Sequence, residues 1–447
     1  MAKIDNTDAT GTGREAGPSR RAILQGGAGL GALALGGVLP QAARAAAGPE
    51  NTIKVGFVSP RTGPLGGFGE CDPWVLDQFR AKLKGGLKAG GKTYDVEFLD
   101  RDSQSDPARA GQLAKGLITS DHVDLMLTTS TPEVTNPVAD AAEAAGTPCL
   151  STIVPWESWY FGRGAKPGQP SPFKWTYHFS FGGKDFFVAY NSLWTGPVKT
   201  NKKVGILYPN DADGNAVREN LAPALAKAGF DIVDGGAYED GTTDFSAQIS
   251  KFKAANCEIF NTFPIPPDFA TFWRQAAQQG YTRMVKIAQI AKTGLFPSQV
   301  EALGTLGYTL ATGCYWHPTF PYGSPVLGLS SQQISDSYEK GTGRQWNQQV
   351  GASVALLDGG VTTLETSTNP KDKNAVVAAL KALKVTTPMG PIDFSTGPVP
   401  NVSTTPIIGC QWLKAKPGSK FKLQLVINEN ADDKKVPIGA PLVPYHP

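Results

Sequence analysis

The sequence lacks most of the features that mark a metal site, a membrane span or a nucleic-acid surface. Its formal net charge is only +3, and Lys and Arg are not clustered as they are in nucleic-acid grooves. The five cysteines show no CxxC spacing, and the four histidines form no HExxH pair. After residue 47, the longest apolar runs are only as long as strands. We therefore expect no metal, no nucleic-acid partner and no membrane-spanning helix in that part of the chain.

A dinucleotide-binding loop is also excluded. The stretch GAGLGA at residues 27–32 satisfies the GxGxxA pattern, but no strand precedes it, and the pattern binds pyrophosphate only between a strand and a helix. We expect no cofactor.

Five cysteines cannot all pair within one chain. Either Cys314 and Cys410, each of which follows a glycine at the end of an apolar run, form one bridge, or the cysteines are small buried thiols.

The first 47 residues have the order of an export signal. Arg20 and Arg21 precede a Gly/Ala/Leu run, and small residues at Ala43 and Ala45 offer a cleavage site. The segment resembles a twin-arginine signal, with Ile23 and Gln25 departing from its usual pattern. We expect a soluble, exported protein that is periplasmic or at the cell surface after cleavage.

The rest of the chain alternates between strand and helix patterns. A chain of 447 residues is long enough for two lobes of about 150–200 residues each. Near-continuous apolar strands such as TIKVGFVSP and VDLMLTT are followed by helical patterns, and the alternation begins again at KKVGILYPND, from residue 202. This pattern is typical of parallel sheets covered on both faces. We predict an α/β fold of two doubly wound, Rossmann-like lobes.

Hydroxyl side chains follow two of the predicted strands. Thr129, Ser130 and Thr131 end one apolar run, and Ser151 and Thr152 end the next. In open parallel sheets, ligands bind beyond the carboxyl ends of the strands. These side chains could therefore hydrogen-bond a small polar ligand without adding charge.

The segment 155–183 is far richer in aromatic residues than the chain as a whole, which has 9% Phe, Trp and Tyr. Its Gly and Pro residues break any helix there. The rings either pack the junction between the lobes or wall a ligand cleft, and among them Trp156, Tyr177 and His178 are candidate ligand contacts. The DADG stretch at residues 211–214 lacks the spaced acids of a calcium loop, so Asp211 is expected to cap a helix or face a ligand.

Three stretches, VGFVSPRTGPLGGFGE, DRDSQSDPARAGQLAKGLI and YEDGTTDFSAQISKFKAANCEIF, resemble the type I periplasmic binding proteins of the leucine/isoleucine/valine-binding family. The resemblance runs from about residue 52 to residue 430. It implies two lobes joined by a three-stranded hinge, with residues 50–176 and 318–390 in lobe 1 and residues 177–317 and 391–447 in lobe 2. It also implies a monomeric solute receptor of an ABC importer, with a membrane permease as its partner.

The resemblance also suggests which residues meet the ligand. It places the hydroxyl loops at the ligand carboxylate and Tyr177 over the ligand. The second-lobe acid that binds an ammonium in this family aligns with the loop FPIPPD, residues 263–268, where Asp268 is the nearest acid and the prolines depart from the pattern. The predicted ligand-binding residues are Thr129, Ser130, Thr131, Ser151, Thr152, Trp156, Tyr177, His178, Asp211, Phe263 and Asp268. The ligand is expected to be an amino acid or a related amide, or alternatively an aromatic carboxylate.

Two other functions were weighed. A hydrolase could use Ser130 or Ser151 with His178 or His317, but the sequence has no GxSxG elbow. A ligand sensor of the same fold would need a transmembrane segment, an output domain or a membrane partner to dock on. We therefore predict a binding protein with no catalytic residues.

Overall fold

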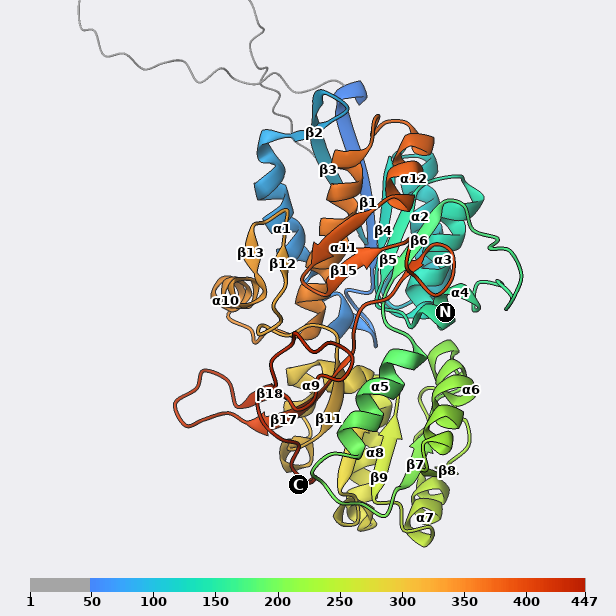
Figure 1. The fold of residues 1–447 in the computed structure, drawn as a ribbon, viewed down its shortest axis with the longest axis vertical. Coiled ribbons are helices and arrows are strands. Elements are labelled where there is room, and N and C mark those ends of the chain that lie inside the picture. Colours follow the sequence, from blue (N-terminus) through green and yellow to red (C-terminus); the bar gives the residue numbers. More distant parts are fainter. Residues whose placement is uncertain (1–48, 447) are drawn as a thin grey trace, which may run out of the picture. The chain divides into compact units, whose positions relative to one another are not determined.

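A computed structural model describes residues 49–446 of the chain, and the export signal predicted for residues 1–47 lies outside this range. The described residues form two α/β lobes, each built on a seven-stranded sheet with its own helices (Figure 1). Within residues 49–446, no helix is both long enough and apolar enough to cross a membrane. The predicted fold class is confirmed.

The first sheet is mostly parallel. Its strand order is β16 (Val402–Ser403), β6 (Thr176–Phe179), β5 (Cys149–Thr152), β4 (Leu125–Thr128), β1 (Thr52–Ser59), β3 (Lys92–Asp102) and β2 (Leu87–Ala89). Only β2 runs antiparallel to its neighbour. The helices of this lobe are α1 (Asp72–Lys82), α2 (Pro107–Thr119), α3 (Pro132–Ala144), α4 (Trp156–Tyr160), α10 (Ser331–Thr342), α11 (Gln348–Thr366) and α12 (Lys373–Lys381).

The second sheet combines five parallel strands with an antiparallel edge. Its order is β18 (Leu423–Ile427), β17 (Ile408–Lys414), β11 (Ala311–Cys314), β10 (Ile287–Ile290), β9 (Ile259–Thr262), β7 (Lys203–Leu207) and β8 (Asp231–Asp234). Strands β17 and β18 run antiparallel to their neighbours. Helices α5 (Gly183–Trp194), α6 (Ala212–Lys227), α7 (Ser246–Ala254), α8 (Pro266–Gln278) and α9 (Pro297–Glu301) belong to this lobe. Two short hairpins, β12 (Gly323–Ser324) with β13 (Leu329–Ser330) and β14 (Lys384–Thr387) with β15 (Gly390–Asp393), lie outside both sheets.

Local sequence signals explain several element boundaries. Asp106 caps α2, since its side chain accepts a hydrogen bond from the amide of Arg109 at 2.6 Å, and Pro107 occupies the first helical position. Helix α1 ends at Lys82, and a 3-10 turn carries the chain through Gly85. Gly86 then adopts φ 88°, a conformation that terminates helices and that glycine takes without strain.

The chain crosses between the two sheets three times, after β6, after β11 and after β16. Backbone hydrogen bonds join the first and third crossings, from Ser180 to Ser403 at 3.1 Å and from Thr405 to Ser180 at 3.2 Å. The limit predicted at residues 176 and 177 falls inside β6, which belongs to the first sheet. Strand β16 pairs with β6 in that same sheet, although residues 391–447 were predicted for the second lobe.

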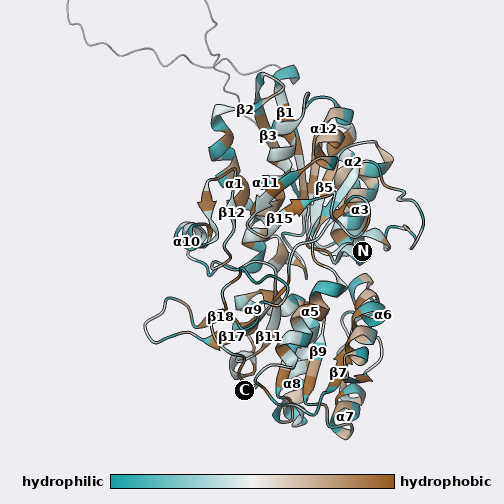
Figure 2. Ribbon diagram, in the orientation of Figure 1, coloured by the Kyte–Doolittle hydropathy of each residue, from teal (hydrophilic) through white to brown (hydrophobic). Residues whose placement is uncertain are grey.

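The core of each lobe is formed by its strands and the apolar faces of the helices, and brown strands mark it in Figure 2. Helix α11 is buried over almost its whole length. Its glycines allow this close approach: a Cβ at Gly359 would touch Leu150 on β5, and one at Gly360 would touch Leu127 on β4. The five cysteines are all buried and unpaired. Cys314 and Cys410 lie on the paired strands β11 and β17, with their thiols in hydrogen-bonding contact.

Candidate functional site

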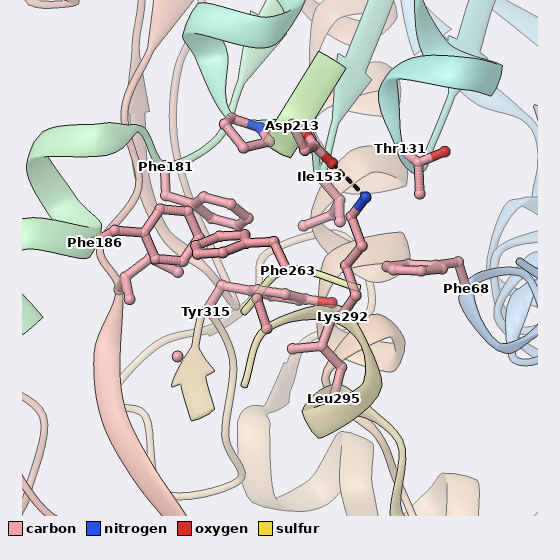
Figure 3. A pocket seen from close by; sticks show the side chains of 14 residues that line it. Phe68, Thr131, Ile153, Phe181, Phe186, Asp213, Phe263, Lys292, Leu295 and Tyr315 are labelled. Carbon is pink, nitrogen blue, oxygen red and sulfur yellow. Dashed lines mark ion pairs between the residues drawn. The ribbon is translucent and has the colours of Figure 1, made fainter. Parts of the chain in front are cut away.

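A pocket lies at the carboxyl ends of the parallel strands of both sheets (Figure 3). About 480 Å³ of space there is not filled by protein atoms, part of which is open to solvent. Its lining residues are Phe68, Thr131, Ile153, Pro155, Phe181, Phe186, Asp213, Phe263, Ala291, Lys292, Leu295, Gly313, Tyr315 and Ile407. Both lobes contribute, so movement of one lobe against the other would open or close it.

Loops that follow the strands position most of these side chains. In the first lobe, Thr131 follows β4 and Ile153 follows β5, and the Thr131 amide donates to the Ile153 carbonyl at 3.1 Å. In the second lobe, Phe263 follows β9, Lys292 follows β10 and Tyr315 follows β11. The carboxyl edge of the parallel strands therefore borders the pocket in both lobes.

The backbone at three of these positions is strained. Thr131, Ile153 and Lys292 adopt left-handed conformations, with φ values of 67°, 58° and 44°. Such values are costly for side chains with a Cβ, and most of all for the β-branched Thr and Ile. Residues held in this way persist only where the surrounding structure fixes them, and they cluster at binding and active sites.

One wall of the pocket consists of aromatic rings that pack against one another. Phe181 stacks on Tyr315 with ring centroids 5.5 Å apart and meets Phe186 edge to face at 5.1 Å. Phe186 in turn meets Phe263 at 5.1 Å. Phe68 reaches the pocket from the first lobe and contacts Phe296 of the second lobe at 4.9 Å. A rigid wall of this kind suits the apolar body of a small ligand.

The opposite wall carries a buried ion-pair cluster. The Lys292 Nζ lies 3.0 Å from the Asp211 Oδ2 and 3.1 Å from the Asp213 Oδ2. Asp211 also caps α6, because its Oδ1 accepts from the Gly214 amide at 2.6 Å. Burial alone would lower the pKa of Lys292, but the charges of Asp213 and Asp211 outweigh it and hold that pKa well above its usual value. Burial raises the pKa of Asp213, and the nearby Lys292 ammonium opposes the rise.

Several predicted residues lie behind the pocket instead of lining it. The Tyr315 hydroxyl donates to the Gln349 Oε1 at 3.3 Å, and the Gln349 Nε2 donates to the Thr129 Oγ1 at 3.2 Å. Thr129 and Ser130 share a hydrogen bond of 2.6 Å between their hydroxyls. The Thr152 hydroxyl donates to the Phe179 carbonyl at 2.6 Å. These hydroxyls support the wall that holds Tyr315.

Ser151 and His178 contact each other. The Ser151 Oγ lies 2.9 Å from the His178 Nδ1, the His178 Nε2 lies 2.8 Å from the Val154 carbonyl, and neither residue is exposed. The His178 ring stacks on Trp159 at 5.0 Å. Burial lowers the pKa of His178 to about 3, so the ring is neutral at physiological pH. A substrate could not reach this pair, which therefore has a packing role.

The buried imidazole of His178 should make the free energy of unfolding depend on pH. Its pKa in the folded chain lies below the unfolded value of 6.5, so the stability it contributes is present above pH 6.5 and is lost as the pH falls. Between pH 7.5 and 4.5 we expect His178 to account for about 3 kcal/mol of lost unfolding free energy. Urea titrations at both pH values should show a smaller difference for His178→Gln, and an unchanged one for His446→Gln, which alters an exposed residue. Equal differences in all three proteins would contradict this assignment.

The remaining predicted residues are distributed as follows. Thr131 and Phe263 line the pocket, and Asp211 adjoins it through Lys292. Tyr177 faces a separate hollow, where its ring meets Phe394 at 5.0 Å. The carboxylate of Asp268 accepts from the Gly241 amide at 3.1 Å and does not line the pocket.

Most of the aromatic segment packs within the first lobe. Trp159 and Tyr160 form a small core with Val154, and Trp156 and Phe161 pack against it. Arg163 lies over Trp159, with its Cζ 4.5 Å from the ring centroid. Of the rings in residues 155–183, only Phe181 lines the pocket.

Sequence reasoning missed Asp213, Lys292 and Tyr315. The rule that selected Thr131, a polar residue just after a buried strand, applies equally to Lys292 and Tyr315, which follow β10 and β11 within two residues. Asp213 lies two residues beyond Asp211 in the DADG stretch, and its position in the first turn of α6 turns it toward the pocket. Within residues 49–446, no group of His, Cys, Asp and Glu side chains is arranged to hold a metal ion.

Comparison with known families gave one match to a family model, that of the periplasmic binding proteins, over residues 52–402. A search of curated proteins found no match. Many solved structures match the fold.

Three of these structures illustrate the matches. A leucine-binding protein from Thermotoga maritima is 16% identical, with a TM-score of 0.66, covering 83% of this chain and 97% of its own. A branched-chain amino acid transporter substrate-binding protein from Streptococcus pneumoniae, in complex with isoleucine, is 16% identical, with a TM-score of 0.64 and coverages of 84% and 99%. A solute-binding protein of an ABC transporter from Rhodopseudomonas palustris, in complex with p-hydroxybenzoic acid, is 19% identical, with a TM-score of 0.65 and coverages of 88% and 97%.

Proposed function

This chain belongs to the periplasmic binding protein family, and on that premise we propose that it is an exported receptor that binds a small organic solute between its lobes and presents it to an ABC permease. The observation that carries the proposal is the pocket with an aromatic wall and a buried Lys–Asp cluster, at the carboxyl edges of both sheets. Binding would hold the two lobes together, which is the signal that a permease could read.

The pocket favours a ligand with an apolar body and one polar head. Its aromatic wall would bury a branched or ring-bearing side chain, while Asp213, Lys292 and Thr131 offer hydrogen bonds to the head. An amino acid with an apolar side chain, or a related amide, fits this division. An aromatic carboxylate is the second candidate, because a ring would lie against Phe181 and Tyr315 and related folds hold hydroxybenzoates.

We infer no catalytic role. The serine and histidine that sequence reasoning considered, Ser151 and His178, have no exposed surface, and the polar atoms of the pocket wall are a threonine hydroxyl and an ion-pair cluster. His317 is hydrogen-bonded to Thr319 at 2.8 Å and to the Leu425 carbonyl at 3.1 Å, without a neighbouring serine. A pocket of this composition binds and releases its ligand.

A thermal-shift panel of amino acids, amino-acid amides and aromatic carboxylates tests the proposed ligand-binding function. One class should raise the melting temperature, since a ligand at 100 times its dissociation constant adds about 2.7 kcal/mol. Phe263→Ala should weaken binding at least about tenfold, because the substitution removes a ring from the pocket wall. Phe230→Ala removes a buried ring of the same lobe outside the pocket and should leave the affinity unchanged. Equal loss in both variants would show that the ligand binds elsewhere.

Uptake measurements test the transport role. Cells that lack this protein should lose high-affinity uptake of the ligand that the panel identifies. Unchanged uptake would contradict the transport role and leave the binding role standing.

A further inference from the structure

The polar wall of the pocket carries more negative than positive charge. Among the residues that line the pocket, Lys292 is the only cation. It is paired with both Asp211 and Asp213. The charge of Glu133, in the first turn of α3 in the opposite lobe, acts on both Lys292 and Asp213. Two carboxylates therefore contact this ammonium, and the charge of a third acts on it. A ligand anion entering here would meet a net negative field, whereas a ligand cation would complete the charge balance.

Two carboxylate oxygens of these interacting groups have no donor, and of the two residues only Asp213 lines the pocket. The Asp213 Oδ1 and the Glu133 Oε2 are both buried without a hydrogen-bond partner, and Asp213 as a residue is only 3% exposed. A buried carboxylate oxygen without a donor is costly, and a ligand N–H group placed against it would remove that cost. Asp213 lines the pocket, and its carboxylate lies beside the Lys292 ammonium at the edge of the cavity (Figure 3).

Lys292 is a poor partner for a ligand carboxylate. Its ammonium has three donors, and two of them are already directed at Asp211 and Asp213 at 3.0 Å and 3.1 Å. Its positive charge is compensated by those two acids.

We propose that the natural ligand carries an ammonium group without a free carboxylate, and that Asp213 determines this specificity by accepting a hydrogen bond from the ammonium. The ligand class is therefore an apolar amine or the amide of an apolar amino acid, with its body against the Phe181, Tyr315 and Phe263 rings. This inference rests on the receptor function proposed above and specifies the chemistry of the same pocket.

A series of ligands of similar shape and different charge tests the proposal on the full-length protein. Phenethylamine, phenylalanine and 3-phenylpropanoate carry net charges of about +1, 0 and −1 at pH 7.5. Isoamylamine, leucine and 4-methylpentanoate repeat the series with an aliphatic body. In at least one series the amine should bind at least tenfold more tightly than the acid and no more weakly than the amino acid, by calorimetric titration.

Two matched variants identify the responsible carboxylate. Asp213→Asn should weaken binding of the amine at least tenfold and remove the preference for amine over acid. Asp124→Asn alters another buried acid paired with a lysine, since the Lys371 Nζ lies 2.7 Å from its Oδ2, but it precedes β4 at the opposite edge of the first sheet. That control should keep the wild-type order of affinities. Circular dichroism and the unliganded melting temperature establish that both variants are folded.

The outcomes separate this inference from the receptor function. Tenfold tighter binding of the amino acid or the acid than of the amine would overturn the inference while supporting a receptor. Absence of binding by the amines of both series and by the amino-acid amides of the wider panel would also overturn it, and the rest of that panel would then decide the receptor function alone. Equal losses of amine affinity in Asp213→Asn and Asp124→Asn would show that Asp213 is not the specificity residue.

Discussion

Replacing Lys292 by methionine is expected to lower the free energy of unfolding by about 3–5 kcal/mol. The substitution keeps the length of the side chain but leaves Asp211 and Asp213 without their shared partner. The side chains of all three residues are nearly inaccessible to water, so solvent would compensate little of the loss. Urea denaturation at pH 7.5 measures the change.

The same variant should gain stability more steeply than the wild type as the pH falls. Burial already raises the pKa of Asp213, and loss of the Lys292 charge would raise it further above its unfolded value. The folded state then binds more protons than the unfolded state, so stability rises as the pH falls from about 8 toward 5. A flat profile over this range would contradict the charge balance described for the cluster.

Two further proteins serve as controls for Lys292→Met. The double variant Lys292→Met with Asp213→Asn should recover part of the lost stability, because it removes one of the two uncompensated acids. Lys371→Met breaks the more exposed pair with Asp124 and should cost less. A loss below about 1 kcal/mol in Lys292→Met, typical of surface pairs, would show that the cluster is not a buried network.

Substituting Gly351 by alanine is expected to destabilise the protein by about 3 kcal/mol. A Cβ at Gly351 would overlap the indole ring of Trp316, which lies in the second crossing between the lobes. That ring cannot easily move, since its Nε1 donates to the Ser331 Oγ at 3.0 Å and Trp346 meets it edge to face at 5.5 Å. Thermal and urea denaturation measure the effect.

Gly116→Ala is the matched control for this prediction. Gly116 lies within α2, and a Cβ there would have no heavy atom within 4 Å. Alanine should stabilise this helix by about 0.5–1 kcal/mol, because it restricts the unfolded chain without a steric cost. If Gly351→Ala also proved neutral or stabilising, the close packing of α11 on Trp316 would be refuted.

The family resemblance seen in the sequence is confirmed by the family match over residues 52–402, and the two α/β lobes are confirmed by the two sheets. These features were predictable because they depend on local patterns. The apolar run at residues 52–59 forms a strand, and Asp106 with Pro107 begins a helix. Each signal determines the structure of residues only a few positions away. That the chain crosses between the lobes three times was expected only from the resemblance to the leucine/isoleucine/valine-binding family, because no local pattern reveals such crossings.

The site was predicted only in part, because facing a pocket depends on contacts between distant segments. Thr129 follows β4 and Ser151 lies near the end of β5, yet Gln349 and His178 bind their hydroxyls behind the pocket. Tyr177 alternates to the other side of β6 and meets Phe394, from a segment more than 200 residues later. No pattern within residues 176–179 decides which side of that strand faces the cavity.

The sequence by itself determined the strand and helix succession, the two-lobe α/β fold and the edge of each sheet at which a ligand would bind, because periodicity and capping are local properties of the chain. Only the tertiary structure decided that Lys292, Asp211 and Asp213 form one buried cluster opposite an aromatic wall. Lys292 follows β10, whereas Asp211 and Asp213 follow β7 at the start of α6. Their distances, their burial and the resulting charge balance exist only once the sheet has set those loops side by side.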